Sequence, residues 1–214
     1  MQMGGGELNE KGRTVWHDYM TNRFMFGKDS GIEQGYEQPG FVPSPTEGFG
    51  LNIQYANTSF GQGMSVTPVQ MAAAFSATIN GGNYFRPTLL DPEAGQAVQP
   101  LKAGIIKPEV SDQVRAMHET TVQRNYQFAM HKGYKVGGKT GTAQITKPEG
   151  GYYDDKYNGT FIGYVGGDTP DYVIMVKIED PKVTGFAGRY AAAPMFGKVV
   201  EMLVQNYAIP LSSQ

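Results

Sequence analysis

Apolar residues recur every three or four positions in four stretches of this 214-residue chain, which is the spacing of one buried helix face. In the second stretch Thr67 suits the N-cap, Pro68 suits the first helical position, and Gly81-Gly82 ends the helix. In the third, the apolar stripe consists of Val110, Val114, Met117 and Val122. The pattern predicts helices over residues 9–23, 68–79, 108–130 and 192–207.

Three other segments are rich in β-branched and aromatic residues, and they predict strands over residues 139–146, 160–165 and 172–178. The short turn at residues 166–171 makes the last two antiparallel neighbours. A fourth candidate, residues 84–90, contains Pro87 and is expected at a sheet edge or outside the main sheet. Helices around a small antiparallel sheet predict an α+β fold. Because three strands are few for this set of helices, we expect part of the sheet to lie outside the chain.

Glycine and proline concentrate between residues 27 and 63, which predicts a long surface excursion. Loops of this length usually serve function or connect lobes. Later in the chain, the acidic pair Asp154-Asp155 follows two tyrosines, and this predicts a solvated hairpin tip.

The composition limits the classes of function. With 40% hydrophobic and 12% aromatic residues, the chain is able to build one core or most of one. Its net charge of -2, without a cluster of lysine or arginine, argues against nucleic acid as a partner. The absence of cysteine excludes disulfides and thiolate chemistry. His17, His118 and His131 lack metal-ligand spacing, so we expect surface or helix-end positions for them and neither metal nor cofactor.

Membrane and export signals are also absent from these residues. No window approaches the 18 apolar residues that span a bilayer, and residues 1–6 do not resemble a secretion signal. We therefore expect any membrane anchor to lie outside this chain.

The run Lys139-Thr140-Gly141-Thr142 is the strongest chemical motif. Lys-Thr-Gly is one third of the signature of penicillin-recognising serine acyl-transferases. The other two thirds are missing, because no serine is followed three places later by lysine and none lies two places before asparagine. The chain alone is therefore predicted to be inactive.

A second motif overlaps the first. Residues 133–140 match the phosphate-loop pattern G-x-x-x-x-G-K-[ST], which requires a buried strand before it and a helix after it. Upstream lies the polar helical stretch, and downstream Ile145-Thr146 favours a strand. The acidic end of the segment 172–180 imitates a magnesium-binding strand, so a nucleotide hydrolase stays open as a lower-ranked alternative.

Several runs follow one another in a fixed order along nearly the whole chain: Phe26-Gly27, Gly31-Ile32-Glu33, Glu37-x-x-Gly40, Phe60 to Ala72, Asn80-Gly81-Gly82, Gly138 to Gln144, Phe161-Ile162-Gly163-Tyr164 and Ala192-Ala193-Pro194-x-Phe196. In this order the sequence resembles the transpeptidase domain of class B penicillin-binding proteins, the D,D-transpeptidases that crosslink peptidoglycan. The spacing and the Ala-Ala-Pro-x-Phe ending favour the division-type branch. The resemblance implies one incomplete domain over residues 1–214 with the penicillin-binding, serine β-lactamase-like fold. It also implies that the N-terminal strands and the nucleophile helix of that fold are missing from the chain.

The resemblance also implies roles for the motif. The catalytic residues are Lys139, whose charge orients the missing Ser-x-Asn hydroxyl and attracts the substrate carboxylate, and Thr142, whose N–H stabilises the oxyanion. The hydroxyls of Thr140 and Thr142 bind that carboxylate, and Gly141 lets the substrate lie against the strand.

The implied ligands are D-Ala-D-Ala stem peptides and β-lactams, and the implied partners are other cell-wall synthesis or division proteins, with no nucleic acid. The implied location is the bacterial cell membrane, with the domain on the extracytoplasmic side. Besides this reading, a non-catalytic derivative that binds stem peptide or partner proteins stays open.

Overall fold

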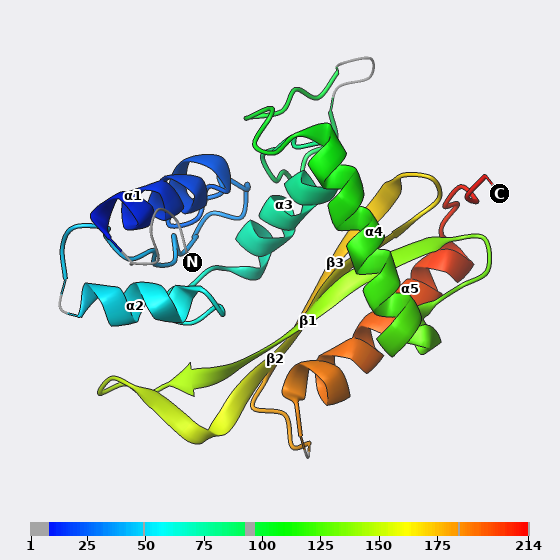
Figure 1. Cartoon of the computed structure of the whole chain (residues 1–214). Helices are drawn as coiled ribbons and strands as arrows, with labels where there is room; N and C mark the ends of the chain where they lie inside the picture. Colours follow the sequence, from blue (N-terminus) through cyan, green and yellow to red (C-terminus); the bar gives the residue numbers. More distant parts are fainter. Residues whose placement is uncertain (1–8, 49, 93–96, 184, 214) are drawn as a thin grey trace. The chain divides into compact units, whose positions relative to one another are not determined.

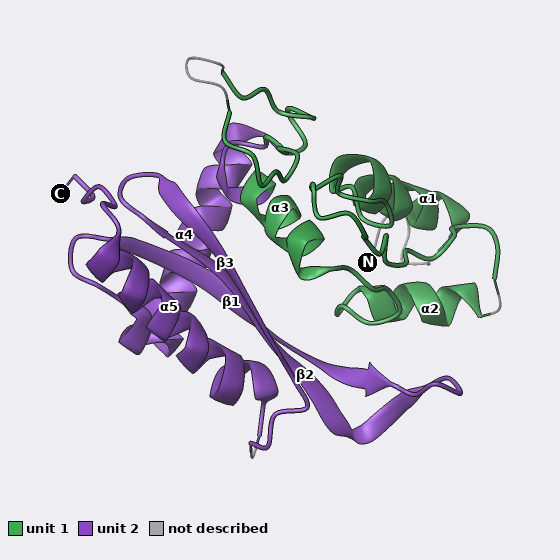
Figure 2. Cartoon of the chain, turned by 180° about the vertical axis from the view of Figure 1, so that it is seen from behind, with its two compact units in different colours: residues 1–77, 83–105 green, residues 78–82, 106–214 purple. Residues whose placement is uncertain are grey.

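The computed structural model describes residues 9–48, 50–92, 97–183 and 185–213 (Figure 1). The chain divides into two compact units, which Figure 2 distinguishes by colour. The first contains residues 1–77 and 83–105, and the second contains residues 78–82 and 106–214. The sheet and the Lys-Thr-Gly motif both belong to the second unit.

The first unit is helical. Helix α1 (Glu10–Asp18) continues into a π-helical turn, η1 (Tyr19–Arg23), which confirms the helix predicted over 9–23. The helix predicted over 68–79 is α3 (Pro68–Ile79), whose last two residues are counted with the second unit. One buried hydrophobic cluster of the first unit consists of Phe26, Ala74, Ala77, Tyr84 and Ile105.

The long excursion contains structure that the sequence pattern missed. Helix α2 (Leu51–Thr58) lies inside it and buries Tyr55, whose ring packs edge-on against Trp16 with centroids 5.3 Å apart. The amide nitrogen of Gln70 donates to the carbonyls of Lys28 and Pro39, so the excursion is tied to α3 within the unit. The strand considered over 84–90 is wrong, since Tyr84 makes only an isolated bridge to Lys102.

The second unit contains an antiparallel sheet of strand order β1-β2-β3. Its strands are β1 (Lys135–Thr146), β2 (Tyr152–Gly166) and β3 (Pro170–Glu179), so all three predicted strands and the β2–β3 pairing are confirmed. The predicted β1 and β2 were too short, because β1 begins at Lys135 and β2 begins at Tyr152. The pair Asp154-Asp155 is exposed but lies within β2, so the predicted hairpin tip is wrong, and the tip is formed by residues 147–151.

Helices pack on this sheet. Helix α4 (Pro108–Asn125) ends earlier than predicted, because Tyr126 adopts a non-helical backbone and is followed by a short 3₁₀ helix, η2 (Gln127–Ala129). A π-helical turn, η3 (Gly188–Ala192), leads into α5 (Ala193–Asn206), which confirms the predicted terminal helix.

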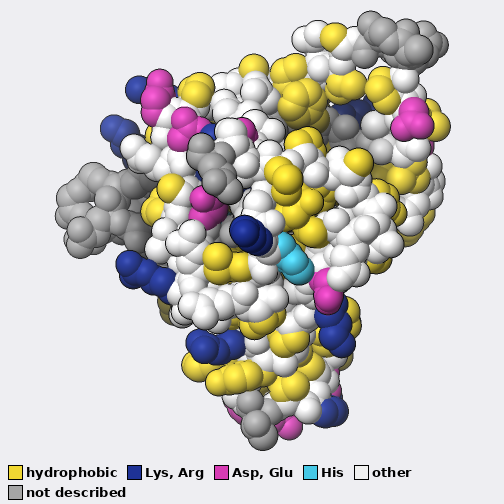
Figure 3. All heavy atoms as spheres, turned by 90° about the vertical axis from the view of Figure 1, so that its right-hand side faces the viewer, with side chains coloured by type: hydrophobic (Ala, Val, Ile, Leu, Met, Phe, Trp, Pro, Cys, Tyr) yellow, Lys and Arg dark blue, Asp and Glu magenta, His cyan; other side chains and the backbone are white. Residues whose placement is uncertain are grey.

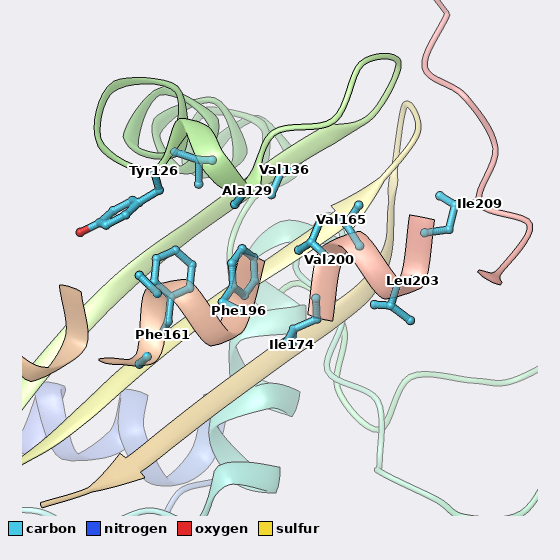
Figure 4. Close-up of a cluster of buried hydrophobic side chains, with 13 residues drawn as sticks. Tyr126, Ala129, Val136, Phe161, Val165, Ile174, Phe196, Val200, Leu203 and Ile209 are labelled. Carbon is cyan, nitrogen blue, oxygen red and sulfur yellow. The ribbon is translucent and has the colours of Figure 1, made fainter. Parts of the chain in front are cut away.

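One hydrophobic core joins α5 to the sheet (Figure 4). Phe161 of β2 stacks on Phe196 of α5 with ring centroids 4.3 Å apart, and Tyr126 meets Phe161 edge-on at 5.3 Å. Val200 and Leu203 continue the buried face of α5. This core covers the face of the sheet against which α5 packs. In the described part of the chain, no helix is long and apolar enough to cross a membrane.

Candidate active site

The residues Lys139, Thr140, Gly141 and Thr142 lie in the middle of β1. Lys139 is exposed and pairs with Ile162 of β2, and its ammonium donates to the backbone oxygen of Thr140 at 2.9 Å. The chain continues as a strand after Thr140, and no helix begins there. The motif therefore does not meet the requirement of a phosphate loop, in which a helix N-terminus faces the phosphates.

The outer edge of β1 presents backbone groups of every second residue. Among the described residues, β1 pairs with β2 alone and leaves its other edge without a strand. Residues of a strand direct their N–H and C=O groups alternately toward the two edges. The carbonyl of Thr140 accepts from the side chain of Lys139. By this alternation, the N–H of Thr142 points to the same free edge.

The two threonine hydroxyls flank this edge from the face of the sheet that carries the core. Thr140 Oγ1 accepts a hydrogen bond from the Tyr126 hydroxyl at 3.3 Å. Thr142 Oγ1 accepts from the backbone N–H of Gly188 at 3.0 Å. Since each hydroxyl acts as an acceptor in these bonds, its own hydrogen remains available to donate to a bound anion.

Small residues are required where other elements approach β1. A Cβ atom on Gly138 would collide with the ring of Phe161, and a Cβ on Gly188 would collide with the carbonyl of Gly141. A side chain on Gly141 would also contact Thr160 Oγ1. The predicted reason for Gly141, close approach of a substrate, is therefore accompanied by a packing reason inside the sheet.

Helix α4 contacts β1 through residues that the predicted apolar stripe did not include. Val122 is fully buried as that stripe predicted, but the stripe is wrong in part, because Val110 and Met117 are exposed and Ser111, which it did not include, is fully buried. The spacing of four from Val122 leads back to His118 and forward to Tyr126. His118 is half-buried, and its imidazole hydrogen-bonds to the backbone of Gly138. The surface or helix-end position predicted for His118 is thus wrong.

The environment of His118 shifts its titration. Burial lowers the pKa of His118 below 6.5, and the nearby charge of Lys139 lowers it further, while the bond to Gly138 acts in the opposite direction. A bond that favours the protonated imidazole must have a carbonyl as its acceptor, which identifies the partner as the C=O of Gly138. At neutral pH the imidazole is accordingly uncharged and donates one N–H.

Next to His118, Glu119 connects α4 to β2. The buried hydroxyl of Tyr164 donates to Glu119 Oε1 at 2.9 Å. Burial, together with the negative charge of Glu119, raises the pKa of Tyr164 strongly. Tyr164 therefore remains a hydrogen-bond donor across the physiological range, and this bond joins the middle of α4 to the strand beside β1.

Taken together, these groups make an edge suited to an anionic, extended ligand. Lys139 supplies a cation, Thr142 supplies an outward N–H, and the threonine hydroxyls supply further donors. On the face shown in Figure 3, lysine and arginine side chains lie scattered among acidic and uncharged ones. No nucleophile of the Ser-x-x-Lys type occurs in the 214 residues.

The motif located four of the site residues from the sequence, and the structure brings all four into one strand. His118, Tyr126 and Gly188 were missed. The signal for the first two was present, because they lie four residues on either side of Val122. Gly188 gave no signal, since its role depends on how η3 meets β1.

Comparison with known proteins gives a consistent result. The family model that describes the penicillin binding protein transpeptidase domain matches residues 9–201. Stage V sporulation protein D of Bacillus subtilis is 37% identical over 204 residues, a match that covers 91% of this chain and 31% of that protein. Peptidoglycan D,D-transpeptidase FtsI of Escherichia coli K12 is 31% identical over 185 residues, covering 84% and 30%.

Solved structures agree with the sequence matches. Penicillin binding protein 3 of Mycobacterium tuberculosis, solved with ampicillin, has a TM-score of 0.76 and 30% identity, and the match covers 91% of this chain and 46% of that one. The transpeptidase domain of penicillin-binding protein 3 of Burkholderia pseudomallei has a TM-score of 0.75 and 26% identity, covering 89% and 57%. The chain thus spans about a third of the length of the two curated relatives.

Proposed function

The chain belongs to the penicillin-binding protein transpeptidase family, and we propose that it is the C-terminal part of a peptidoglycan D,D-transpeptidase domain that crosslinks stem peptides by serine acyl transfer. The observation that carries this proposal is the position of Lys139 to Thr142 on the free edge of β1. In this proposal the two compact units are parts of one incomplete domain over residues 1–214.

The missing groups come from a segment outside these residues. That segment contributes the Ser-x-x-Lys nucleophile and base and the Ser-x-Asn element. The serine oxygen forms a bond to the carbonyl carbon of the penultimate D-alanine, and the terminal D-alanine leaves with a proton on its amine. An acceptor amine then displaces the serine and completes the crosslink.

Each residue of the motif serves this reaction. The charge of Lys139 attracts the terminal carboxylate and orients the Ser-x-Asn hydroxyl. The hydroxyls of Thr140 and Thr142 donate to the same carboxylate. The outward N–H of Thr142 stabilises the oxyanion together with the N–H of the nucleophilic serine. Because Gly141 has no side chain, the peptide is able to lie along β1 as an added strand.

The proposed cellular setting is that of the family. Such a domain acts on the extracytoplasmic side of the bacterial membrane, anchored by a segment outside this chain, together with other proteins of cell-wall synthesis or division. Two relatives support a division-type role: Stage V sporulation protein D and peptidoglycan D,D-transpeptidase FtsI. Binding of β-lactams is proposed by analogy, because the Mycobacterium tuberculosis protein was solved with ampicillin.

The test measures the rate at which the complete product of the gene is acylated by a fluorescent penicillin. Lys139→Ala removes the cation from the free edge of β1, and we expect acylation to slow by about 100-fold or more. Lys177→Ala is the matched control, because Lys177 lies on β3 and forms only an exposed pair with Glu179 at 3.8 Å. That variant should react at the wild-type rate.

A different result would favour the second function. The absence of Ser-x-x-Lys from the 214 residues is the observation that supports a non-catalytic derivative. If the complete product bound a D-Ala-D-Ala peptide reversibly, through Lys139, and never formed a covalent penicillin adduct, a stem-peptide-binding role would replace the catalytic one.

A further inference from the structure

The two residues that flank Lys139 are hydrogen-bonded to side chains of α4 and of Tyr126, the residue that follows α4. The carbonyl of Gly138 accepts from the imidazole of His118, and the hydroxyl of Thr140 accepts from Tyr126 at 3.3 Å. Gly138 is buried and Thr140 is half-buried. Lys139 itself projects into solvent between these two attachment points. The position from which its side chain departs is therefore set by groups that belong to another element.

The attachment points lie in one row. His118, Val122 and Tyr126 are spaced by four residues, which places them along one face of α4 and just beyond its end. Val122 is fully buried and Tyr126 is nearly so, and both belong to the core beneath the sheet. Figure 1 shows α4 crossing β1, the strand that carries the motif. His118 is the polar residue of this row and is bonded to the carbonyl of Gly138. It therefore makes a specific contact with β1 and is not a solvated position of the helix.

The free edge explains why this contact matters. In the described part of the sheet, β1 has a hydrogen-bonded neighbour on only one side. An edge strand with one partner is more mobile than a central strand, whereas electrostatic catalysis requires donors that are fixed before the substrate arrives. His118 occupies the edge one residue before Lys139 and leaves the edge open from Lys139 onward.

The charges around His118 are compatible with an uncharged imidazole that donates one hydrogen bond. Lys139 faces it from β1 and disfavours the protonated imidazole. On α4 itself, Glu119 accepts from the Tyr164 hydroxyl of β2, and Arg115 pairs with Asp112. The carboxylate beside His118 is thus engaged with Tyr164.

We propose that α4 is a positioning element for Lys139, in which His118 holds the carbonyl of Gly138 and Tyr126 holds the hydroxyl of Thr140. Neither residue touches the reacting atoms. Both act by fixing the segment of β1 that presents Lys139 and the N–H of Thr142. This inference rests on the proposed function, because it assigns the two residues to the same acyl-transfer site.

The test compares three variants of the complete gene product in β-lactam acylation. His118→Leu fills the half-buried space but donates nothing, and we expect acylation to slow by about tenfold. His118→Gln keeps an N–H donor and should recover the rate to within about threefold of the wild type. Gln113→Leu is the matched control at an exposed position of the same helix, and it should have no effect.

A second readout measures local order. Amide hydrogen exchange at residues 138–142 should quicken in His118→Leu but not in His118→Gln, while exchange in β3 stays unchanged. Tyr126→Phe removes only the hydroxyl and keeps the ring in the core. It provides the same comparison at Thr140 if His118→Leu does not fold.

The outcomes separate the two proposals. If His118→Leu and Tyr126→Phe both react at the wild-type rate, or if faster exchange spreads evenly over the sheet, the positioning role is wrong. If the wild-type protein takes up no β-lactam at all, the proposed function fails. Hydrogen exchange in residues 138–142 then still decides whether α4 fixes this segment of β1.

Discussion

The β1–β2 hairpin consists of two halves that differ in their support. In the inner half, Val136, Gly137 and Gly138 are buried, β3 pairs with β2, and α4 and α5 pack against the sheet. In the outer half, residues 146–157 extend past the end of β3, as Figure 1 shows. The register shifts between Gln144 and Thr146, where the two halves meet.

The difference between the halves shows what fixes the motif. Lys139 to Thr142 lie on the inner side of the register shift. There, Thr140 is hydrogen-bonded to Tyr126, and Gly138 packs against the buried ring of Phe161. In the outer half, the side-chain contacts besides strand pairing include two lysines over the ring of Tyr153, and these three side chains are only partly buried. The outer half is held mainly by backbone pairing, whereas the motif is also held by packing from the second half of α4 and from α5.

The largest predicted contrast between the halves is in core packing. Phe161→Ala removes a fully buried ring that contacts Tyr126 and Phe196, and it should lower the free energy of unfolding by about 3–5 kcal/mol. Tyr157→Ala, the matched change in the outer half, should cost less than about 1 kcal/mol because its ring is partly exposed. Urea denaturation measures both. Equal losses would show that the outer half is as tightly packed as the inner half.

A glycine pair sharpens the contrast at the site. Gly138→Ala places a methyl group against Phe161 and should cost about 1–3 kcal/mol while slowing acylation by β-lactams. Gly150→Ala meets no atom within 4 Å, and its cost of about 1 kcal/mol comes only from its φ of +101°. It should leave acylation unchanged. Slower acylation in Gly150→Ala would mean that the hairpin tip takes part in the reaction.

The pH dependence of stability tests the contact at His118. The pKa of His118 is lowered on folding, so the unfolded chain binds more protons between pH 6.5 and the lower folded pKa. Its stabilising contribution is therefore complete above pH 6.5 and is lost as the pH falls through the folded value. Glu33, Glu37 and Asp168 also have lowered pKa values, but they act only in more acidic solution, below about pH 4.5.

Thermal melting from pH 7.5 to 5 makes this comparison. The wild-type protein should lose more stability over the interval than His118→Gln, which cannot titrate at that position. Parallel curves for the two proteins would show that His118 is as solvated in the folded chain as in the unfolded one.

The smallest expected effect is in the outer half. Lys156 Nζ lies 4.5 Å from the centroid of the Tyr153 ring, and Lys156→Ala should cost about 0.5 kcal/mol because both side chains remain partly accessible to solvent. The β-lactam acylation rate should not change. A fall in the free energy of unfolding of more than about 2 kcal/mol would indicate that the outer half of the hairpin depends on this contact.

Much of this fold could be predicted because most of its elements have strong periodicity or strong punctuation. Helix α3 begins at Pro68 and ends before a glycine pair, and α5 has a continuous buried face. Helix α2 was missed because it buries only Tyr55 and Thr58 and follows Gly50, which has a left-handed backbone. The beginning of β1 was missed because Gly137 and Gly138 interrupt the β-branched pattern.

The site was predictable as far as its chemistry lies in consecutive residues. Lys139 to Thr142 form a motif, and the structure places them together on one strand. The spacing of four from Val122 places His118 on the buried face of α4, but its partner depends on how α4 approaches that strand, and the contact of Gly188 depends on how η3 does so. On α4, the valine and methionine stripe was misleading because buried Ser111 and half-buried His118 occupy the inner face.

The central claim is that Lys139 to Thr142 form the edge of a serine acyl-transfer site. The most direct measurement is the intact mass of the complete gene product after incubation with a β-lactam. The account predicts an added mass equal to one whole β-lactam molecule, which forms slowly or not at all in Lys139→Ala. An unchanged mass in the wild-type protein, at concentrations that saturate penicillin-binding proteins, would contradict it.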